Sequence, residues 1–186
     1  MKGLKGQKGF TLVEIAIVLV IIGLLLGAVL KGQSMIKNAK IKGVIRSADE
    51  MRAAVHTYQD RYRALPGDDN QPTNHTGVAG LTAGDGDGTI ELTERVHVFN
   101  HLAAAGIISG ETNRTTFPAH AFGDSYYIYY VALGTKTTHW IVYENLPGDA
   151  ARTIDYSIDD GVFNTGAVRA AADYNNDATS TLYIEF

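Results

Sequence analysis

Apolar residues change their spacing along the chain after residue 30. From Phe10 to Leu30 they form an almost unbroken run, FTLVEIAIVLVIIGLLLGAVL, interrupted by one charged residue, Glu14. About 20 apolar residues are enough for an α-helix to cross a lipid bilayer. The sequence therefore predicts a transmembrane helix over residues 10–30.

Beyond Lys31 the apolar residues recur every three or four positions, which is typical of one face of an α-helix. The residues that follow this spacing are Ile41, Val44, Ile45, Ala48, Met51, Val55, Tyr58 and Tyr62. Pro66 and Gly67 then end the pattern. We therefore expect one helix from Phe10 to Ala64, in which residues 31–65 are an amphipathic continuation whose apolar stripe packs on a small domain.

Residues 66–186 are predicted to form a globular domain of class α+β. The stretch 66–88 is rich in Gly, Asp, Asn and Thr and is predicted to be a long loop. We expect two helices and three strands after it. The helices are predicted at 92–105, with Leu92, Val96, Phe99 and Leu102 inward, and at 148–157, and the strands at 125–133, 137–145 and 181–186. These strands would form a small antiparallel sheet resting on the long helix.

Composition and charge narrow the possible functions. The chain has 186 residues, no Cys and a formal net charge of −4, so disulfides are excluded. Basic residues gather between Lys31 and Arg63, whereas the region after Asp68 is acidic. An acidic distal domain argues against nucleic acid as its main partner. Lysines in the leader, residues 1–9, favour a cytoplasmic N-terminus, because basic residues flanking a transmembrane helix tend to stay on the cytoplasmic side. The lysines just after the apolar run reduce the difference in positive charge between the two ends of the helix.

Residues 1–30 admit three interpretations. In a secretory signal peptide the apolar stretch is about 7–15 residues long and a cleavage site of small residues follows it. A plain signal-anchor helix would keep the whole segment, but it gives Glu14 no role. In the third interpretation a peptidase cuts between Gly9 and Phe10 and leaves the helix on the mature protein.

Glu14 favours the third interpretation, because a carboxylate inside a bilayer is costly unless a partner neutralises it. Gly9 provides a flexible residue without a side chain at the cleaved bond. Cleavage there creates a new α-amine on Phe10, a cation that can pair with the carboxylate. This requirement points to assembly with other copies rather than to catalysis.

The segment KGFTLVEI, residues 8–15, closely resembles the N-terminus of the type IV pilin and type II secretion pseudopilin family. The resemblance implies that a prepilin peptidase cuts after Gly9 and that Phe10 is N-methylated. It also implies that Glu14 pairs with the Phe10 amine of the adjacent subunit as a filament grows from the inner membrane. The chain differs from many adhesive pilins, which carry two cysteines, and its helix lacks the proline that often interrupts pilin helices.

The best candidate for a metal site is residues 83–94, AGDGDGTIELTE, which can be aligned with the calcium-binding loop of an EF-hand. The residues at matching positions are Asp85, Asp87, Gly88, Thr89 through its carbonyl, and Glu94. Ala83 stands where the first Asp belongs, so water or a residue among 68–70 would have to complete the shell. Two interpretations stay open. The segment is either a calcium-binding loop or a Gly/Asp turn followed by acidic residues, whose negative charge is favourable at the N-terminus of a helix.

Other candidate sites carry weaker signals. Two further acidic groups, Asp155, Asp159 and Asp160, and Asp173, Asn175 and Asp177, are more typical of solvated turns. His97 and His101 are one helical turn apart and could share a metal ion, but no HExxH motif surrounds them. No P-loop, GxSxG or GxGxxG motif occurs, so we do not expect an enzyme.

The sequence therefore predicts a structural subunit of a type II secretion pseudopilus or a type IV pilus. Such a subunit would span the bacterial inner membrane once, with its C-terminal domain in the periplasm, and then join other pilin-like subunits in a filament. The alternative is a monomeric, membrane-anchored domain that binds a partner in a calcium-dependent way through the loop around Asp85.

Overall fold

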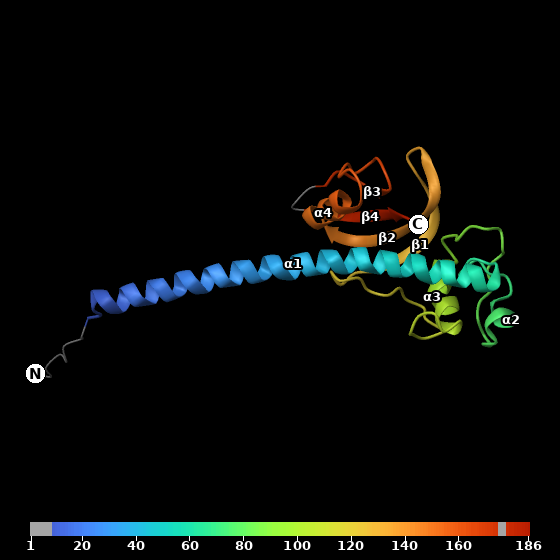
Figure 1. The fold of residues 1–186 in the computed structure, drawn as a ribbon, viewed down its shortest axis with the longest axis horizontal. Helices are drawn as coiled ribbons and strands as arrows, with labels where there is room; N and C mark the ends of the chain where they lie inside the picture. Colours follow the sequence, from blue (N-terminus) through green and yellow to red (C-terminus); the bar gives the residue numbers. More distant parts are fainter. Residues whose placement is uncertain (1–8, 175–177) are drawn as a thin grey trace, which may run out of the picture. The chain divides into compact units, whose positions relative to one another are not determined.

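A continuous helix, α1 (Leu12–Tyr62), occupies the N-terminal part of the chain and confirms the long helix predicted over residues 10–64 (Figure 1). The computed structural model describes residues 9–174 and 178–186. It divides the chain into two units, Met1–Ala39 and Lys40–Phe186, and α1 contributes to both. The predicted leader, residues 1–9, lies outside the described residues except for Gly9.

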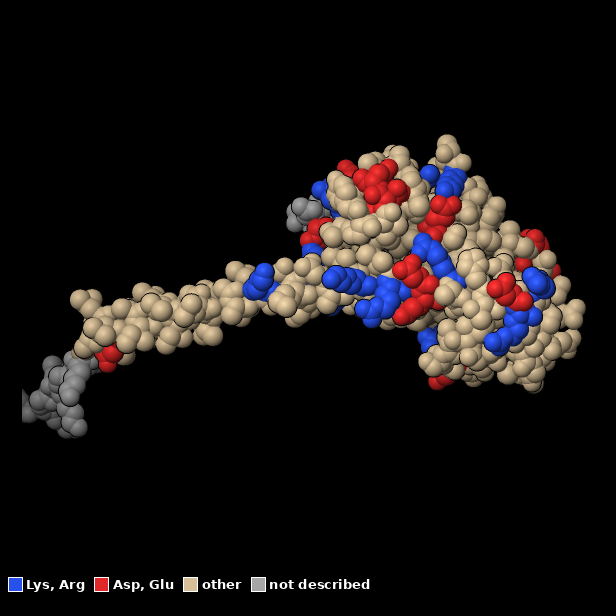
Figure 2. Space-filling model, in the orientation of Figure 1, with Lys and Arg blue, Asp and Glu red and all other residues tan. Residues whose placement is uncertain are grey.

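The N-terminal stretch of α1 exposes apolar side chains all around the helix. Leu12 is 91% exposed and Leu24 is 71% exposed. Within the described residues, α1 is the helix that is long and apolar enough to cross a membrane. Figure 2 shows this stretch almost free of charged atoms. Because such a surface is unfavourable in water, lipid or other apolar helices must cover it.

The second unit is built on a four-stranded antiparallel sheet with the strand order β1-β2-β4-β3. Three strands were predicted, and the structure places them at β1 (Tyr126–Leu133), β2 (Lys136–Pro147) and β4 (Thr179–Glu185). The short edge strand β3 (Val168–Ala170) was not predicted. The predicted α+β class is therefore confirmed.

The amphipathic part of α1 packs on one face of this sheet. Tyr143 on β2 reaches α1, where its hydroxyl lies 2.8 Å from the Ser47 hydroxyl. The Arg52 guanidinium donates a 2.6 Å hydrogen bond to the carbonyl of Glu185 at the end of β4. The buried residues of α1 are Ile41, Val44, Ala48, Met51, Ala54, Val55 and Tyr58. The apolar stripe predicted from the sequence is thus the core face of the helix.

Three shorter helices complete the second unit. Helix α4 (Gly148–Ile158) follows β2 directly, and β2 and β4 lie between α4 and α1 in Figure 1. Helix α2 (Pro72–Thr76) lies inside the segment that was predicted to be an unbroken loop. Helix α3 (Arg95–Ala104) contacts β1 and agrees with the helix predicted at 92–105 except at its start.

The expected inward position of Leu92 is wrong, because its side chain is 61% exposed. It belongs to a turn before α3 rather than to the helix. The Glu94 carboxylate accepts hydrogen bonds from the Asp85 and Glu91 N–H groups, and this holds the turn against the preceding loop. Phe99 and Leu102 are buried, as expected.

Candidate functional site

Gly9 and Phe10, the predicted processing residues, lie just before α1 and are exposed. Phe10 has 84% of its surface accessible. No helical hydrogen bonding constrains the bond between them, because α1 starts at Leu12. The bond between Gly9 and Phe10 therefore lies outside the helix, between two exposed residues.

Glu14 closes the first turn of α1 together with Thr11. The Glu14 carboxylate accepts a 2.7 Å hydrogen bond from the Thr11 N–H and a 2.8 Å bond from the Thr11 hydroxyl. In return the Thr11 hydroxyl accepts a 3.2 Å bond from the Glu14 N–H. This reciprocal arrangement is a capping box, which satisfies backbone donors that have no partner in the helix. Glu14 was predicted to act in assembly, and this local role was not predicted.

The loop between α2 and α3 wraps around the buried carboxylate of Asp68, which is 3% exposed. One oxygen of Asp68 accepts hydrogen bonds from the Gly86 N–H at 2.8 Å and the Asp87 N–H at 3.1 Å. The other accepts a 2.9 Å bond from the Gly88 N–H. Gly86 and Gly88 have φ of +77° and +91°, conformations that side-chain-bearing residues rarely adopt. The glycines therefore allow the turn to direct three N–H groups at one carboxylate.

Three carboxylates gather at this turn and could hold a metal ion. Asp68, Asp85 and Asp87 each offer an oxygen within 4.8 Å of the other two. Of the predicted ligands, Asp85 and Asp87 belong to this group. Glu94 is instead 7% exposed, and its two oxygens accept backbone N–H groups. Asp68 is one of the residues 68–70 that were expected, as an alternative to water, to complete the shell.

Burial and a neighbouring charge both act on the Asp68 carboxylate of this group. Burial raises the pKa of Asp68, an effect that the hydrogen bonds from the Gly88 and Gly86 N–H groups oppose, and the charge of Glu94 raises it further. Crowded carboxylates repel each other, and a hard cation with oxygen ligands relieves this repulsion. The Thr89 hydroxyl and N–H both donate to Asp87 Oδ1, which orients that carboxylate.

A second group of carboxylates lies at the end of α4, with Asp155 in the helix and Asp159 and Asp160 just after it, and each offers an oxygen within 4.8 Å of the other two. The fully buried Asp155 accepts hydrogen bonds from the Tyr174 hydroxyl at 2.6 Å and the Gly161 N–H at 3.2 Å. Asp159 accepts a bond from the Ala167 N–H. Acidic atoms gather on the surface around α4 and β3 in Figure 2. Asn175 and Asp177, part of the third predicted acidic group, lie outside the described residues.

The structure assigns His101 to the core rather than to a metal site shared with His97. Its Nδ1 accepts a 2.9 Å hydrogen bond from the Gly67 N–H, and its Nε2 lies 2.8 Å from the Thr82 carbonyl. Both ring nitrogens are therefore occupied, and the side chain is fully buried. Burial lowers the pKa of His101, so the ring is held neutral.

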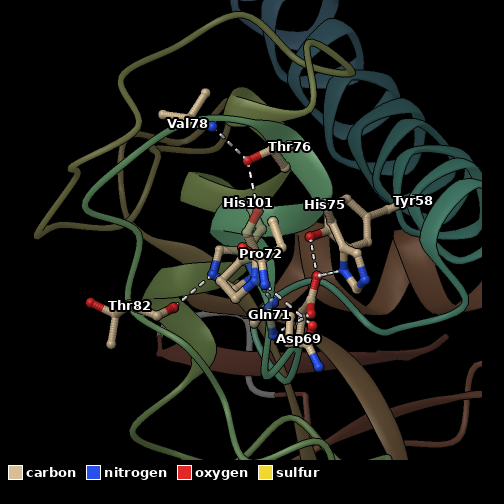
Figure 3. A network of polar contacts seen from close by, with 11 residues as sticks. Tyr58, Asp69, Gln71, Pro72, His75, Thr76, Val78, Thr82 and His101 are labelled. Carbon is tan, nitrogen blue, oxygen red and sulfur yellow. Dashed lines mark hydrogen bonds and ion pairs between the residues drawn. The ribbon is translucent and has the colours of Figure 1, made fainter.

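A polar network that the sequence analysis missed fixes the segment after α1 (Figure 3). The buried Asp69 carboxylate accepts hydrogen bonds from the Tyr58 hydroxyl at 2.6 Å and the Gln71 N–H at 2.8 Å, and it lies 2.7 Å from Nδ1 of His75. Burial alone would raise the pKa of Asp69, but the bonds from Tyr58 and His75 outweigh it and lower the pKa. The spacing of these residues along the chain does not indicate that they meet.

Comparisons with known proteins agree with the N-terminal part of this description. Residues 4–30 match the family described as the prokaryotic N-terminal methylation motif. No curated protein and no solved structure matches the chain. The comparison thus covers the segment that contains Gly9, Phe10 and Glu14, and it does not extend to the globular unit.

The chain carries the N-terminal methylation motif of the type IV pilin and pseudopilin family. Together with the long apolar N-terminal helix, this motif defines a pilin-like protein. Pilin-like proteins are usually structural subunits without enzymatic activity. The motif implies processing by a prepilin peptidase, anchoring in the inner membrane and assembly of the pilus type.

Proposed function

We propose that this protein is a structural subunit of a type II secretion pseudopilus or a type IV pilus. In this proposal the peptidase cuts after Gly9, Phe10 is N-methylated, and the mature subunit polymerises through its N-terminal helix. Before assembly the subunit spans the inner membrane once, with residues 66–186 in the periplasm. The observation that carries the proposal is an acidic residue, Glu14, in the first turn of an exposed apolar helix and inside the matched methylation motif.

The physical reason is the cost of placing a carboxylate in hydrocarbon. The capping box gives Glu14 hydrogen bonds, but it brings no positive charge to the carboxylate. The amine that cleavage creates on Phe10 of a neighbouring subunit supplies that charge. Each buried group becomes tolerable through the other, so the pair specifies how the subunits are placed in the filament.

Two measurements test the proposal. Mass spectrometry of the protein from its native cells is expected to show a chain that starts at a methylated Phe10. Glu14→Ala is expected to insert in the membrane normally but to yield few filaments, whereas the matched control Glu91→Ala is expected to assemble like the wild type. An intact leader, or a normal filament yield from Glu14→Ala, contradicts the proposal.

We propose calcium as the ion for the carboxylates of Asp68, Asp85 and Asp87. Calcium takes six to eight oxygen ligands, and three carboxylates supply part of that shell while water supplies the rest. The gathering of three carboxylates within 4.8 Å of one another is the feature that supports a cation here. A calcium site is compatible with a filament subunit. It is also what a monomeric calcium-dependent binding domain would need, and the N-terminal mass separates these two functions.

A further inference from the structure

A pocket of about 230 Å³ lies in the second unit between α1, α3 and the segment that leads to β1. Its apolar lining includes Met51, Phe99 and Tyr126. The Tyr126 ring stacks on Tyr143 at a centroid distance of 5.5 Å and meets Phe99 edge to face at 5.7 Å, so it forms part of a packed aromatic surface. The volume is below the roughly 300–1,000 Å³ of pockets for drug-sized ligands. The pocket therefore suits a small metabolite.

Charged side chains of both signs line this pocket. Glu50 comes from α1, and Glu111 and Arg114 come from the segment after α3. Within the described residues, none of these three side chains forms a hydrogen bond or an ion pair. Two carboxylates and a guanidinium thus share one small pocket without neutralising each other. Such an arrangement leaves both kinds of charge available to a ligand.

Arg114 is held at the pocket through its backbone. Its N–H donates a 2.8 Å hydrogen bond to Asn100 Oδ1, and its carbonyl accepts a 3.1 Å bond from Asn100 Nδ2. Asn100 belongs to α3 and is buried. The Arg114 guanidinium lies beside Gly110, which also lines the pocket, because a Cβ placed on Gly110 would stand 3.7 Å from Arg114 Nη2. The positive group is therefore positioned at the pocket in the free protein, which lowers the cost of binding.

The Tyr126 hydroxyl has a charge of each sign near it. Burial raises the pKa of Tyr126, the charge of Glu50 raises it further, and the charge of Arg114 lowers it. The hydroxyl therefore stays protonated at neutral pH. Within the described part of the chain it has no hydrogen-bond partner, so it can donate to a ligand or accept from one. A carboxylate on α1 and a guanidinium on the segment after α3 thus act on one point of the aromatic surface.

We infer that the pocket binds a free α-amino acid with a large apolar side chain. Such a molecule carries an ammonium and a carboxylate on the same carbon. Its carboxylate accepts the paired planar donors of Arg114. Its ammonium has three donors, which Glu50 and Glu111 accept. Its side chain covers the apolar lining near Phe99 and Tyr126.

A ligand with a single charge matches the pocket less well. A Lys or Arg side chain of another protein has no carboxylate beside its cation, so it leaves Arg114 unpaired next to a second positive charge. A simple organic anion has to face Glu50 and Glu111. Leaving a partly buried charge without a partner costs free energy. A zwitterion pairs charges of both signs, and this selects it over either alternative.

Isothermal titration calorimetry of the full chain in detergent tests the inference, with L-phenylalanine and L-leucine as probes. Both are expected to bind saturably. Three analogues of phenylalanine each lack one of the matched features. Phenethylamine lacks the carboxylate, 3-phenylpropanoate lacks the ammonium, and glycine lacks the apolar side chain. Each analogue is expected to bind at least about tenfold more weakly than phenylalanine, because a charged hydrogen bond or the buried apolar surface is lost.

Variants of the charged residues should respond only to ligands that carry the matching group. Arg114→Gln is expected to lower the affinity for phenylalanine at least about tenfold, because the carboxylate loses its partner, and not to weaken the binding of phenethylamine. The double variant Glu50→Gln/Glu111→Gln is expected to lower the affinity for phenylalanine and not to weaken the binding of 3-phenylpropanoate. This pattern distinguishes a lost ligand contact from a general loss of the pocket.

Arg63→Gln and Glu91→Gln are the matched controls, because both residues are exposed and neither lines the pocket. They should bind phenylalanine like the wild type, and Trp140 fluorescence shows whether each variant is folded. Absence of saturable binding for both amino acids overturns the inference. Equal affinities for phenylalanine and phenethylamine also overturn it, since they would assign the pocket to a simple amine. Neither outcome affects the proposed filament function, which the N-terminal mass and the Glu14→Ala filament yield test separately.

Discussion

The Tyr58 hydroxyl donates a 2.6 Å hydrogen bond to the Asp69 carboxylate, and both residues are buried. Tyr58 lies in the last turns of α1, and Asp69 lies in the segment that leaves the helix. The bond therefore determines the direction of the chain after α1, and it positions the neighbouring Asp68 under the acidic turn. Burial raises the pKa of the Tyr58 hydroxyl, and so does its hydrogen bond to Asp69, so it remains a donor at neutral pH.

Tyr58→Phe is expected to lower the free energy of unfolding of the globular unit by about 2 kcal/mol, because a hydrogen bond to a buried charge is lost. Tyr62→Phe, one turn further along α1, is the matched control, because Tyr62 stacks on His75 at 5.4 Å and this contact needs only the ring. The control should stay within about 0.5 kcal/mol of the wild type. Denaturant unfolding of the full chain in detergent, followed by Trp140 fluorescence, measures both.

A double-mutant cycle with Asp69→Asn tests whether the two residues act together. If the bond is the main contribution of Tyr58, the Tyr58→Phe change should cost much less in the Asp69→Asn background. Equal costs in the two backgrounds would assign the effect to packing of the ring instead.

His101 makes stability depend on pH, and the sign follows from its environment. Burial lowers the pKa of His101 below its ordinary value of 6.5. Between that lowered value and 6.5 the unfolded chain binds more protons than the folded chain, so stability falls as the pH falls through this window. Protonation would also place a hydrogen on Nδ1, which now accepts the Gly67 N–H.

We expect His101→Gln to be less stable than the wild type at pH 7.5 and to lose part of the decline in stability between pH 6.5 and pH 5. One proton contributes at most about 1.4 kcal/mol per pH unit. His120→Gln is the variant for comparison. Burial also lowers the pKa of His120, but its ring nitrogen contacts the Glu144 carbonyl, elsewhere in the unit. An unchanged pH slope in His101→Gln would show that this histidine is not the titrating group.

Much of the fold could be predicted because its main elements carry strong local patterns. The apolar run after Phe10 and the stripe from Ile41 define α1, and the Tyr- and Val-rich segments on either side of Gly134 define the hairpin of β1 and β2. These signals depend on side chains in one short window, where the period of apolar residues differs between helix and strand. The bounds of α4 and β4 were close for the same reason.

The missed features depend on contacts between distant residues. Strand β3 has three residues, Val168–Ala170, and exists because it pairs with β4. The network around Asp69 brings together α1, α2 and the loop between them, which no local window contains. Asp68 joins Asp85 and Asp87 across a turn for the same reason. His101 follows a helical spacing typical of an exposed residue, yet the loop that follows α2 buries it.

Calcium binding is expected to stabilise the globular unit through Asp85 and Asp87. A ligand present at about 100 times its dissociation constant adds about 2.7 kcal/mol to the stability of the state that binds it. We therefore expect calcium to raise the unfolding temperature of the full chain and a chelator to reverse this rise. Asp85→Asn should abolish the response, whereas Asp160→Asn, in the second acidic group, should retain it.

Magnesium at the same concentration is a useful comparison, because its smaller shell and slower dehydration disfavour this kind of site. No shift with either ion would assign the carboxylates to the turn alone, where Asp68 already binds three N–H groups. A response in Asp85→Asn equal to that of the wild type would place the ion elsewhere.

Glu14 has two roles that substitutions can separate, a capping bond to Thr11 and the proposed charge pairing between subunits. Glu14→Gln keeps an oxygen that can accept the Thr11 N–H but removes the negative charge. Thr11→Val removes the hydroxyl of the capping box and keeps the charge, at a cost to the helix of about 1 kcal/mol.

If charge pairing drives assembly, Glu14→Gln should yield few filaments while Thr11→Val assembles at a reduced rate. If the cap is what matters, Thr11→Val should be the more defective variant. The two outcomes are distinguished by counting the filaments sheared from cells that hold equal amounts of each subunit in the membrane. Charge pairing predicts the defect of Glu14→Gln because a neutral amide does not stabilise the charge of the Phe10 amine.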